Sequence, residues 1–178
     1  MSVLTRARRL LAGQAGYNMI ELLITVAILS TVIGALTVLF VQATNSEVEM
    51  NRRFQAQLTA RVAIDKMRRE IHCASAITPT GATNSISVTL PAQCPTAGGS
   101  LTTVTYDTAG SGQRWQLRRN AVNLADYVTS QNVFSYAAPV SGVSLGKLTV
   151  TLPINTTPAN GEKEWKVVAG MVLRNTTR

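Results

Sequence analysis

The sequence predicts an α+β protein in which a long N-terminal transmembrane helix continues into an ectodomain and packs there on an antiparallel β-sheet. Three observations predict this class. Twenty consecutive uncharged, mostly apolar residues occupy positions 22–41, and residues 35–78 contain neither Pro nor Gly. After Pro79 the chain is rich in Thr, Ser, Gly, Asn and Val, with closely spaced turns. A length of 178 residues suits one modest domain with an appendage.

The apolar segment 22–41 is long enough to cross a membrane. As a helix it covers about 30 Å, which matches the hydrocarbon core of a bilayer. Thr25, Ser30, Thr31 and Thr37 are tolerable in lipid, because each hydroxyl can hydrogen-bond to a carbonyl one turn back. A continuous helix is therefore the expected conformation.

Charged residues flank the apolar segment unequally. Three arginines precede it with no acidic residue before Glu21, whereas Glu47 and Glu49 come before the next arginine on the far side. An excess of positive charge marks the cytoplasmic side of a span. We therefore predict a single-pass protein of the cytoplasmic membrane with its N-terminus inside.

Glu21 stands at the cytoplasmic edge of the apolar helix. A carboxylate there costs free energy and is by default a hypothesis for a functional site that needs a partner. The alternative is a simple cap in the headgroup region, where the helix dipole offsets part of the cost. A secretory signal peptide fits less well, because its cleavage site follows the apolar core, whereas Gly16 precedes it here.

Residues 16–23, Gly-Tyr-Asn-Met-Ile-Glu-Leu-Leu, resemble the class III signal of type IV pilins and type II secretion pseudopilins. The resemblance implies that a prepilin peptidase cuts between Gly16 and Tyr17 and methylates the new amine of Tyr17. It also implies that Glu21 attracts the N-terminal amine of a neighbouring subunit. An ammonium paired with a carboxylate at low dielectric recovers much of what each group loses on leaving water.

Three shorter stretches narrow this resemblance within the family. Residues 61–71, 115–119 and 172–175 are similar to the corresponding stretches of J-type minor pseudopilins and W-type minor pilins. The implied fold is the pilin fold. It divides the chain into a leader peptide (1–16), a transmembrane and assembly helix (17–41) and an extracytoplasmic domain (42–178).

The outer half of the expected helix, which extends to about residue 76, is amphipathic. One apolar stripe with steps of four and three residues is expected to face the core. Its members are Ala60, Ile64, Met67, Ile71 and Ala74.

On the solvent face of that helix, Asp65 and Arg69 are four residues apart and are expected to pair. Phe54 and Leu58 lie off the apolar stripe, facing either neighbouring helices or a covering loop. His72 is more typical of a C-terminal dipole partner than of a ligand.

Five or six strands are expected after Pro79, and the helix stripe covers the face that they cannot bury themselves. A turn at residues 109–112 predicts a hairpin between the second and third of them. The expected strands are 85–90, 101–107, 114–119, 133–137, 147–152 and 165–174. Trp115 and Trp165 are interpreted as apolar anchors for the sheet, with exposed adhesive aromatics as the alternative.

Cys73 and Cys94 are expected at the helix end and in the loop before Pro95. Both lie outside the cytoplasm in the predicted topology, where disulfides persist. A bridge between them would contribute roughly 3 kcal/mol by the chain-entropy model. The alternative is two unrelated buried thiols.

The charge balance leaves a DNA-binding role open. Without residues 1–16, Lys and Arg fall from 17 to 14 against nine acidic residues, so the net charge is +5. The pairs Arg52-Arg53, Arg68-Arg69 and Arg118-Arg119 could meet phosphates, although a charge run on an amphipathic helix is usually a solvated face.

An enzymatic role has little support in the sequence. One His and two Cys make a metal cage or a Ser-His-Asp triad improbable. The acidic residues Asp107, Asp126, Glu162 and Glu164 are scattered. No catalytic residue, cofactor or metal is predicted.

These patterns, with the family resemblance, predict a minor pilin or pseudopilin that helps to initiate or cap a filament. A major pilin and a DNA-binding competence pilin are the alternatives. The expected partners are the prepilin peptidase, other major and minor pilin subunits and the inner-membrane assembly platform. After assembly the protein is expected in an extracytoplasmic filament at the cell surface or in the periplasm.

Overall fold

A computed structural model describes residues 18–160 and 164–175. Contacts within the chain divide it into two compact units, Met1–Val48 and Glu49–Arg178. The predicted leader and the cleavage-site residues Gly16 and Tyr17 lie outside the described residues.

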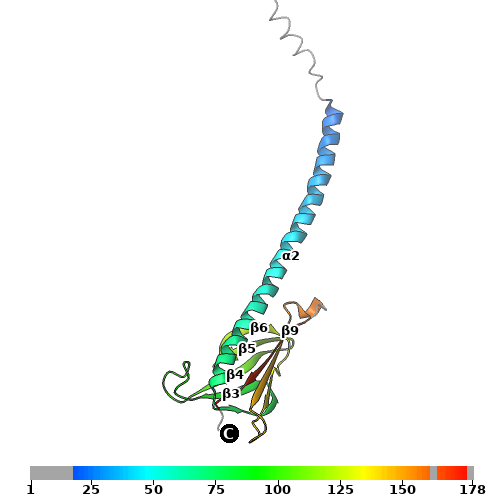
Figure 1. The fold of residues 1–178 in the computed structure, drawn as a ribbon. Helices are drawn as coiled ribbons and strands as arrows, with labels where there is room; N and C mark the ends of the chain where they lie inside the picture. Colours follow the sequence, from blue (N-terminus) through cyan, green and yellow to red (C-terminus); the bar gives the residue numbers. More distant parts are fainter. Residues whose placement is uncertain (1–17, 161–163, 176–178) are drawn as a thin grey trace, which may run out of the picture. The chain divides into compact units, whose positions relative to one another are not determined.

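The 55-residue helix α2 (Met19–Cys73) confirms the prediction of one long helix (Figure 1). It is uninterrupted because it contains no Pro and only one Gly, Gly34. A single Gly costs a helix only about 1 kcal/mol, which is too little to break it. Among the described residues, α2 is the one helix that is long and apolar enough to cross a membrane.

In the described residues of the second unit, nine strands follow α2, with one short 3-10 helix between the last two. Their bounds are β1 (Ala76–Thr78), β2 (Gly81–Thr83), β3 (Ser85–Leu90), β4 (Thr102–Ser111), β5 (Arg114–Arg119), β6 (Val122–Val128), β7 (Phe134–Ala137), β8 (Lys147–Ile154), η1 (Pro158–Asn160) and β9 (Trp165–Val172).

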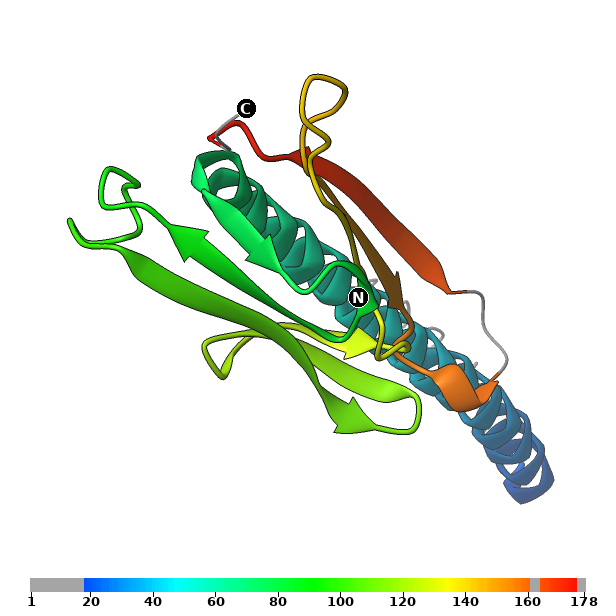
Figure 2. The same ribbon diagram turned by 90° about the horizontal axis from the view of Figure 1, so that it is seen from below.

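All of the strand pairs are antiparallel, in the order β1-β3-β4-β5-β6-β8-β7-β2, with β9 added to β8. Figure 2 shows the strands of the second unit curving around the part of α2 in that unit, as a half-barrel around a rod. This arrangement confirms the α+β class and the antiparallel sheet.

The core of the second unit lies between α2 and the inner face of the sheet. All five residues of the predicted apolar stripe are buried, including Ala74 just beyond the helix. The strands supply alternate residues to the same core, as in Ile86, Val88 and Leu90 of β3. The stripe therefore covers the sheet as predicted.

The six expected strands are all present, but β1, β2 and β6 were not expected. The sequence of β6, Val-Asn-Leu-Ala-Asp-Tyr-Val, lacks clean alternation. It is held by pairing with β5 across register shifts, and by a turn in which Asn120 and Ala121 both have positive φ, as a type I′ hairpin turn requires.

Two local expectations were wrong. The β4–β5 turn lies at Gly112 and Gln113, because β4 extends through Ser111, which pairs with Arg114. Asp65 pairs with Arg68 at 3.2 Å and not with Arg69. Spacings of three and of four residues both bring side chains together on one helix face, so the spacing alone did not distinguish the two arginines.

Candidate assembly site

The candidate site is the first half of α2, where apolar side chains surround the helix on every side. Each of the large apolar residues from Met19 to Val41 is exposed in the chain by itself. A helix that is apolar all round is stable when lipid or other helices cover it. This segment therefore requires a covering that residues 18–160 and 164–175 do not supply.

The four hydroxyl residues of this segment satisfy their polar atoms within the helix. Thr25 donates to the carbonyl of Leu22, and Thr37 donates to that of Ile33, at 2.9 and 2.8 Å. The two remaining bonds run from Ser30 to Ala27 and from Thr31 to Ile28. This confirms the predicted pattern, which removes the penalty for an unpaired hydroxyl in lipid.

Glu21 lies in the first turn of α2, with its side chain exposed. Its backbone N–H donates to the carbonyl of Asn18 at 2.9 Å. Within the described residues its carboxylate has no hydrogen-bond or ion-pair partner. The helix dipole favours an anion at this end, and the exposed carboxylate can pair with a cation.

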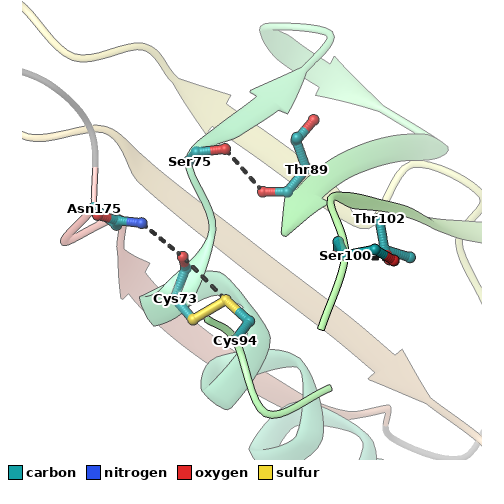
Figure 3. Close-up of a disulfide and its surroundings, with 7 residues drawn as sticks. All are labelled: Cys73, Ser75, Thr89, Cys94, Ser100, Thr102 and Asn175. Atoms are coloured by element: carbon teal, nitrogen blue, oxygen red, sulfur yellow. Dashed lines mark hydrogen bonds between the residues drawn. A yellow bond between two sulfur atoms is a disulfide. The ribbon is translucent and has the colours of Figure 1, made fainter. Parts of the chain in front are cut away.

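Cys73 and Cys94 form a disulfide, with their Cα atoms 5.9 Å apart (Figure 3). It joins the last residue of α2 to the connection between β3 and β4. Asn175 donates from Nδ2 to the carbonyl of Cys73 at 3.3 Å. The end of the helix is therefore tied both to this connection and to the segment after β9.

A buried polar cluster, which no pattern in the sequence predicted, joins α2 to the sheet. Glu70 is 1% exposed. Tyr106 Oη donates to its carboxylate at 2.6 Å, and Arg119 Nε and Nη2 donate to it at 3.1 and 3.0 Å. Tyr106 and Arg119 face one another across β4 and β5, so the two strands hold the carboxylate together.

The cluster changes the acidity of its members. Burial, followed by the hydrogen bond to Glu70, raises the pKa of Tyr106 well above its usual value. Burial alone would lower the pKa of Arg119, but the hydrogen bond and negative charge of Glu70 outweigh it and raise that pKa. At neutral pH the tyrosine is therefore protonated and the guanidinium charged.

Two further contacts tie α2 to the sheet of the second unit. Thr156 Oγ1 donates to Glu49 Oε1 at 2.6 Å; this bond, and then the one from Arg53, lowers the pKa of Glu49. At the other end His72 Nδ1 lies 2.9 Å from the carbonyl oxygen of Val172. His72 therefore has a tertiary contact that its sequence position did not predict.

The two tryptophans are half-buried and pack against the core. Trp115 donates from Nε1 to the carbonyl of Gly112 at 2.9 Å, and the guanidinium of Arg61 lies over the ring of Trp165. They therefore act as anchors that keep one polar edge or one face toward solvent. Phe54 and Leu58 are exposed, so no described loop covers them.

Each of the three arginine pairs has at least one member in an ion pair within the chain. These are Arg53 with Glu49, Arg68 with Asp65, Arg118 with Asp107 and Arg119 with Glu70. A paired guanidinium has less attraction for phosphate. The structure therefore reduces the case for a DNA-binding surface.

The scattered acids do not converge on one place among the described residues. Asp107 pairs with Arg118, Asp126 accepts from Asn123, and Glu164 accepts from Thr129. Glu162 lies outside the described residues. In the described part of the chain no three His, Cys, Asp or Glu side chains are grouped closely enough to hold a metal ion.

No protein-family model, curated protein or solved structure matches this chain. The functional conclusion therefore depends on the residues and on their geometry.

Proposed function

We propose that this chain is a minor pilin or pseudopilin, a low-abundance structural subunit that helps to initiate or cap a type IV pilus or type II secretion pseudopilus. The observation that carries the proposal is Glu21, a carboxylate in the first turn of an all-round apolar helix that has no partner among the described residues. It lies five residues after Gly16, in the sequence order of a class III signal.

The proposed mechanism begins with cleavage between Gly16 and Tyr17, which frees an amine at the start of the helix. The amine of one subunit pairs with Glu21 of its neighbour, which satisfies both charges away from water and sets the register between helices. The exposed apolar side chains of the first half of α2 then pack against the equivalent helices. The sheet domain, the proposed pilin fold, selects the neighbouring minor subunits.

Processing is tested by N-terminal sequencing of the protein recovered from its native host. The mature chain is expected to begin at Tyr17, and Gly16→Ala is expected to leave the leader attached. If the native protein still carries residues 1–16, the filament-subunit proposal is wrong, and the chain is instead a β domain tethered by its apolar helix.

The role of Glu21 is tested by filament incorporation in the same host. Glu21→Ala is expected to be cut and inserted normally but to be reduced about tenfold or more in sheared filaments, because the amine of the neighbouring subunit loses its partner. Glu47→Ala is the matched control, since it removes an exposed carboxylate of the same helix outside the apolar segment. Equal incorporation of both variants would refute the role.

A further inference from the structure

The last strand, β9, forms an edge of the sheet. It pairs with β8 over all eight residues without a register shift, from Trp165 opposite Ile154 to Val172 opposite Lys147. No strand in the described part of the chain pairs with its other side. One long and regular edge of backbone donors and acceptors is therefore open.

The hydrogen bonds at the end of β9 identify which residues face this open edge. Leu173 N–H donates to the carbonyl of Gly146, so odd-numbered residues point their backbone groups toward β8. The carbonyl of Val172 instead meets His72 on the other side. The backbone groups directed outward are those of Lys166, Val168, Gly170 and Val172.

Sheet edges are normally protected by proline, bulges, short length or charged side chains. β9 has eight residues, no Pro, no bulge and a single charge, on Lys166. Val168 is 64% exposed at the centre of the edge, and Gly170 adds no side chain. His72 closes only the final carbonyl, so the edge from Lys166 to Gly170 can accept another strand.

The chemistry around the edge limits what such a strand can be. Backbone pairing requires an extended segment, and the side chains nearby favour acidic residues in it. Lys166 lies on β9 itself, the Lys147 side chain reaches to 3.3 Å from the position of a Cβ on Gly170, and Arg61 stacks on Trp165. Glu164, just before the strand, is the acid beside them and already accepts a hydrogen bond from Thr129. The three basic side chains outnumber it, so the net charge of these four side chains is positive.

A second copy of this chain offers at most one acidic residue on a strand with an open side. Among the described residues, the strands with an open side are β1 and β2, which carry no charge, β9, which carries a lysine, and β6, which meets β8 only at Val128. β6 carries one acid, Asp126, which already accepts a hydrogen bond from Asn123. Two copies paired through β9 would therefore bring basic edges together. A strand with several acidic residues must therefore come from a different protein.

We propose that β9 is a docking edge, and that its occupant is an extended, acidic strand of another protein, which adds to the sheet beside Lys166, Val168 and Gly170. This inference goes beyond the proposed function. It concerns the sheet of the second unit and requires neither cleavage after Gly16 nor Glu21.

The test uses the full-length protein in detergent micelles and measures fluorescence anisotropy of labelled, end-capped peptides. The probe is Glu-Val-Glu-Val-Glu-Val; its comparisons are the same peptide with alternate backbone amides N-methylated, and Lys-Val-Lys-Val-Lys-Val. The expected result is saturable binding of the acidic probe at concentrations up to about 1 mM. N-methylation on the pairing side and the change to lysine should each weaken it about tenfold or more.

Two variants locate the site. Val168→Pro removes one outward N–H but no bond to β8, and is expected to weaken binding of the acidic peptide about tenfold. Lys166→Glu keeps the backbone and is expected to reverse the preference between acidic and basic peptides. Leu101→Pro, at an exposed apolar position outside the strands, is the control and should bind as wild type. Thermal unfolding checks that all three variants fold.

Three results would overturn the proposal. Equal binding of the N-methylated peptide would exclude backbone pairing, and equal or absent binding of the acidic and basic peptides would exclude the charge complement. Self-association abolished by Val168→Pro would make a second copy the occupant. Because binding is measured without assembly, failure here leaves the proposed filament function intact, and failure of Glu21 to act in assembly leaves this edge intact.

Discussion

Glu70 illustrates how much a single side chain contributes to placing α2 on the sheet. Removing the Glu70 carboxylate from water costs free energy. Its buried ion pair with Arg119 is stable only if further hydrogen bonds satisfy the remaining lone pairs of the carboxylate. Tyr106 and Arg119 together provide three donor atoms within 3.1 Å. The helix position that meets these donors is thereby specified.

Replacing Tyr106 by Phe tests this cluster through its pH dependence. Free tyrosine ionises near pH 10, and the pKa of Tyr106 is raised in the folded protein, first by burial and then by Glu70. Its contribution to stability is therefore complete below pH 10 and declines above it, where the unfolded chain loses the proton and the folded chain keeps it. Tyr136, whose pKa burial also raises, adds to the same decline.

Tyr106→Phe is expected to lower stability at pH 7 by about 2 kcal/mol through the lost hydrogen bond to a charged group. The substitution should also make the free energy of unfolding fall less steeply between about pH 10 and 11. Urea unfolding of the protein in micelles, followed by fluorescence of the two tryptophans, measures both effects. Tyr127→Phe keeps the tyrosine number equal as a control; an unchanged alkaline decline in Tyr106→Phe would contradict the assignment.

At the scale of elements, α2 presents two different surfaces. In the second unit one side of the helix is buried against the sheet, whereas Met50, Phe54 and Leu58, spaced by four residues, form an exposed apolar row. These exposed side chains do not stabilise the chain by itself, but their burial against another surface would be favourable. The disulfide at Cys73 closes the same helix against the β3–β4 connection.

Phe54→Ser is expected to leave the stability of the second unit within about 0.5 kcal/mol of wild type, because the side chain is exposed. If the proposed helix packing extends along this row, incorporation into filaments should fall severalfold. Immunoblots of sheared filaments measure this, with Gln55→Ser as the exposed neighbouring control. Normal incorporation of Phe54→Ser would remove this row from the assembly surface.

Replacing both Cys73 and Cys94 by Ser is expected to destabilise the fold by roughly 3 kcal/mol, the chain-entropy contribution for a loop with this separation of 21 residues. Alkylation of the wild type should label neither thiol until a reductant is added. Thermal unfolding with and without reductant provides the comparison. Free labelling of both thiols in the oxidised protein would show that no bridge forms.

At the scale of the whole molecule, charge is the property that distinguishes filament subunit from DNA-binding subunit. The chain without residues 1–16 has a net charge of +5, but several of its arginines are engaged with Glu49, Asp65, Asp107 and Glu70. Paired charges release fewer counterions on binding to phosphate, and counterion release supplies non-specific DNA affinity.

We therefore expect only weak DNA retardation at low salt, lost by about 150 mM salt. Electrophoretic mobility shifts of the purified protein across a salt series measure this, and a basic protein of similar size serves as control. Retention of tight binding at physiological salt would favour the competence-pilin alternative over a structural subunit.

Four features could be predicted from the order of amino acids alone: the length of the apolar segment 22–41, the internally satisfied hydroxyls, the apolar stripe and six of the strands. These features follow from local periodicity and composition, which each segment carries alone. The Glu70 cluster, β6 and the open edge of β9 depend instead on contacts between separate segments of the chain. Glu70 was hidden because its partners lie 36 and 49 residues away, and only the folding of β4 and β5 over the helix converts an ordinary helical glutamate into a buried, paired one.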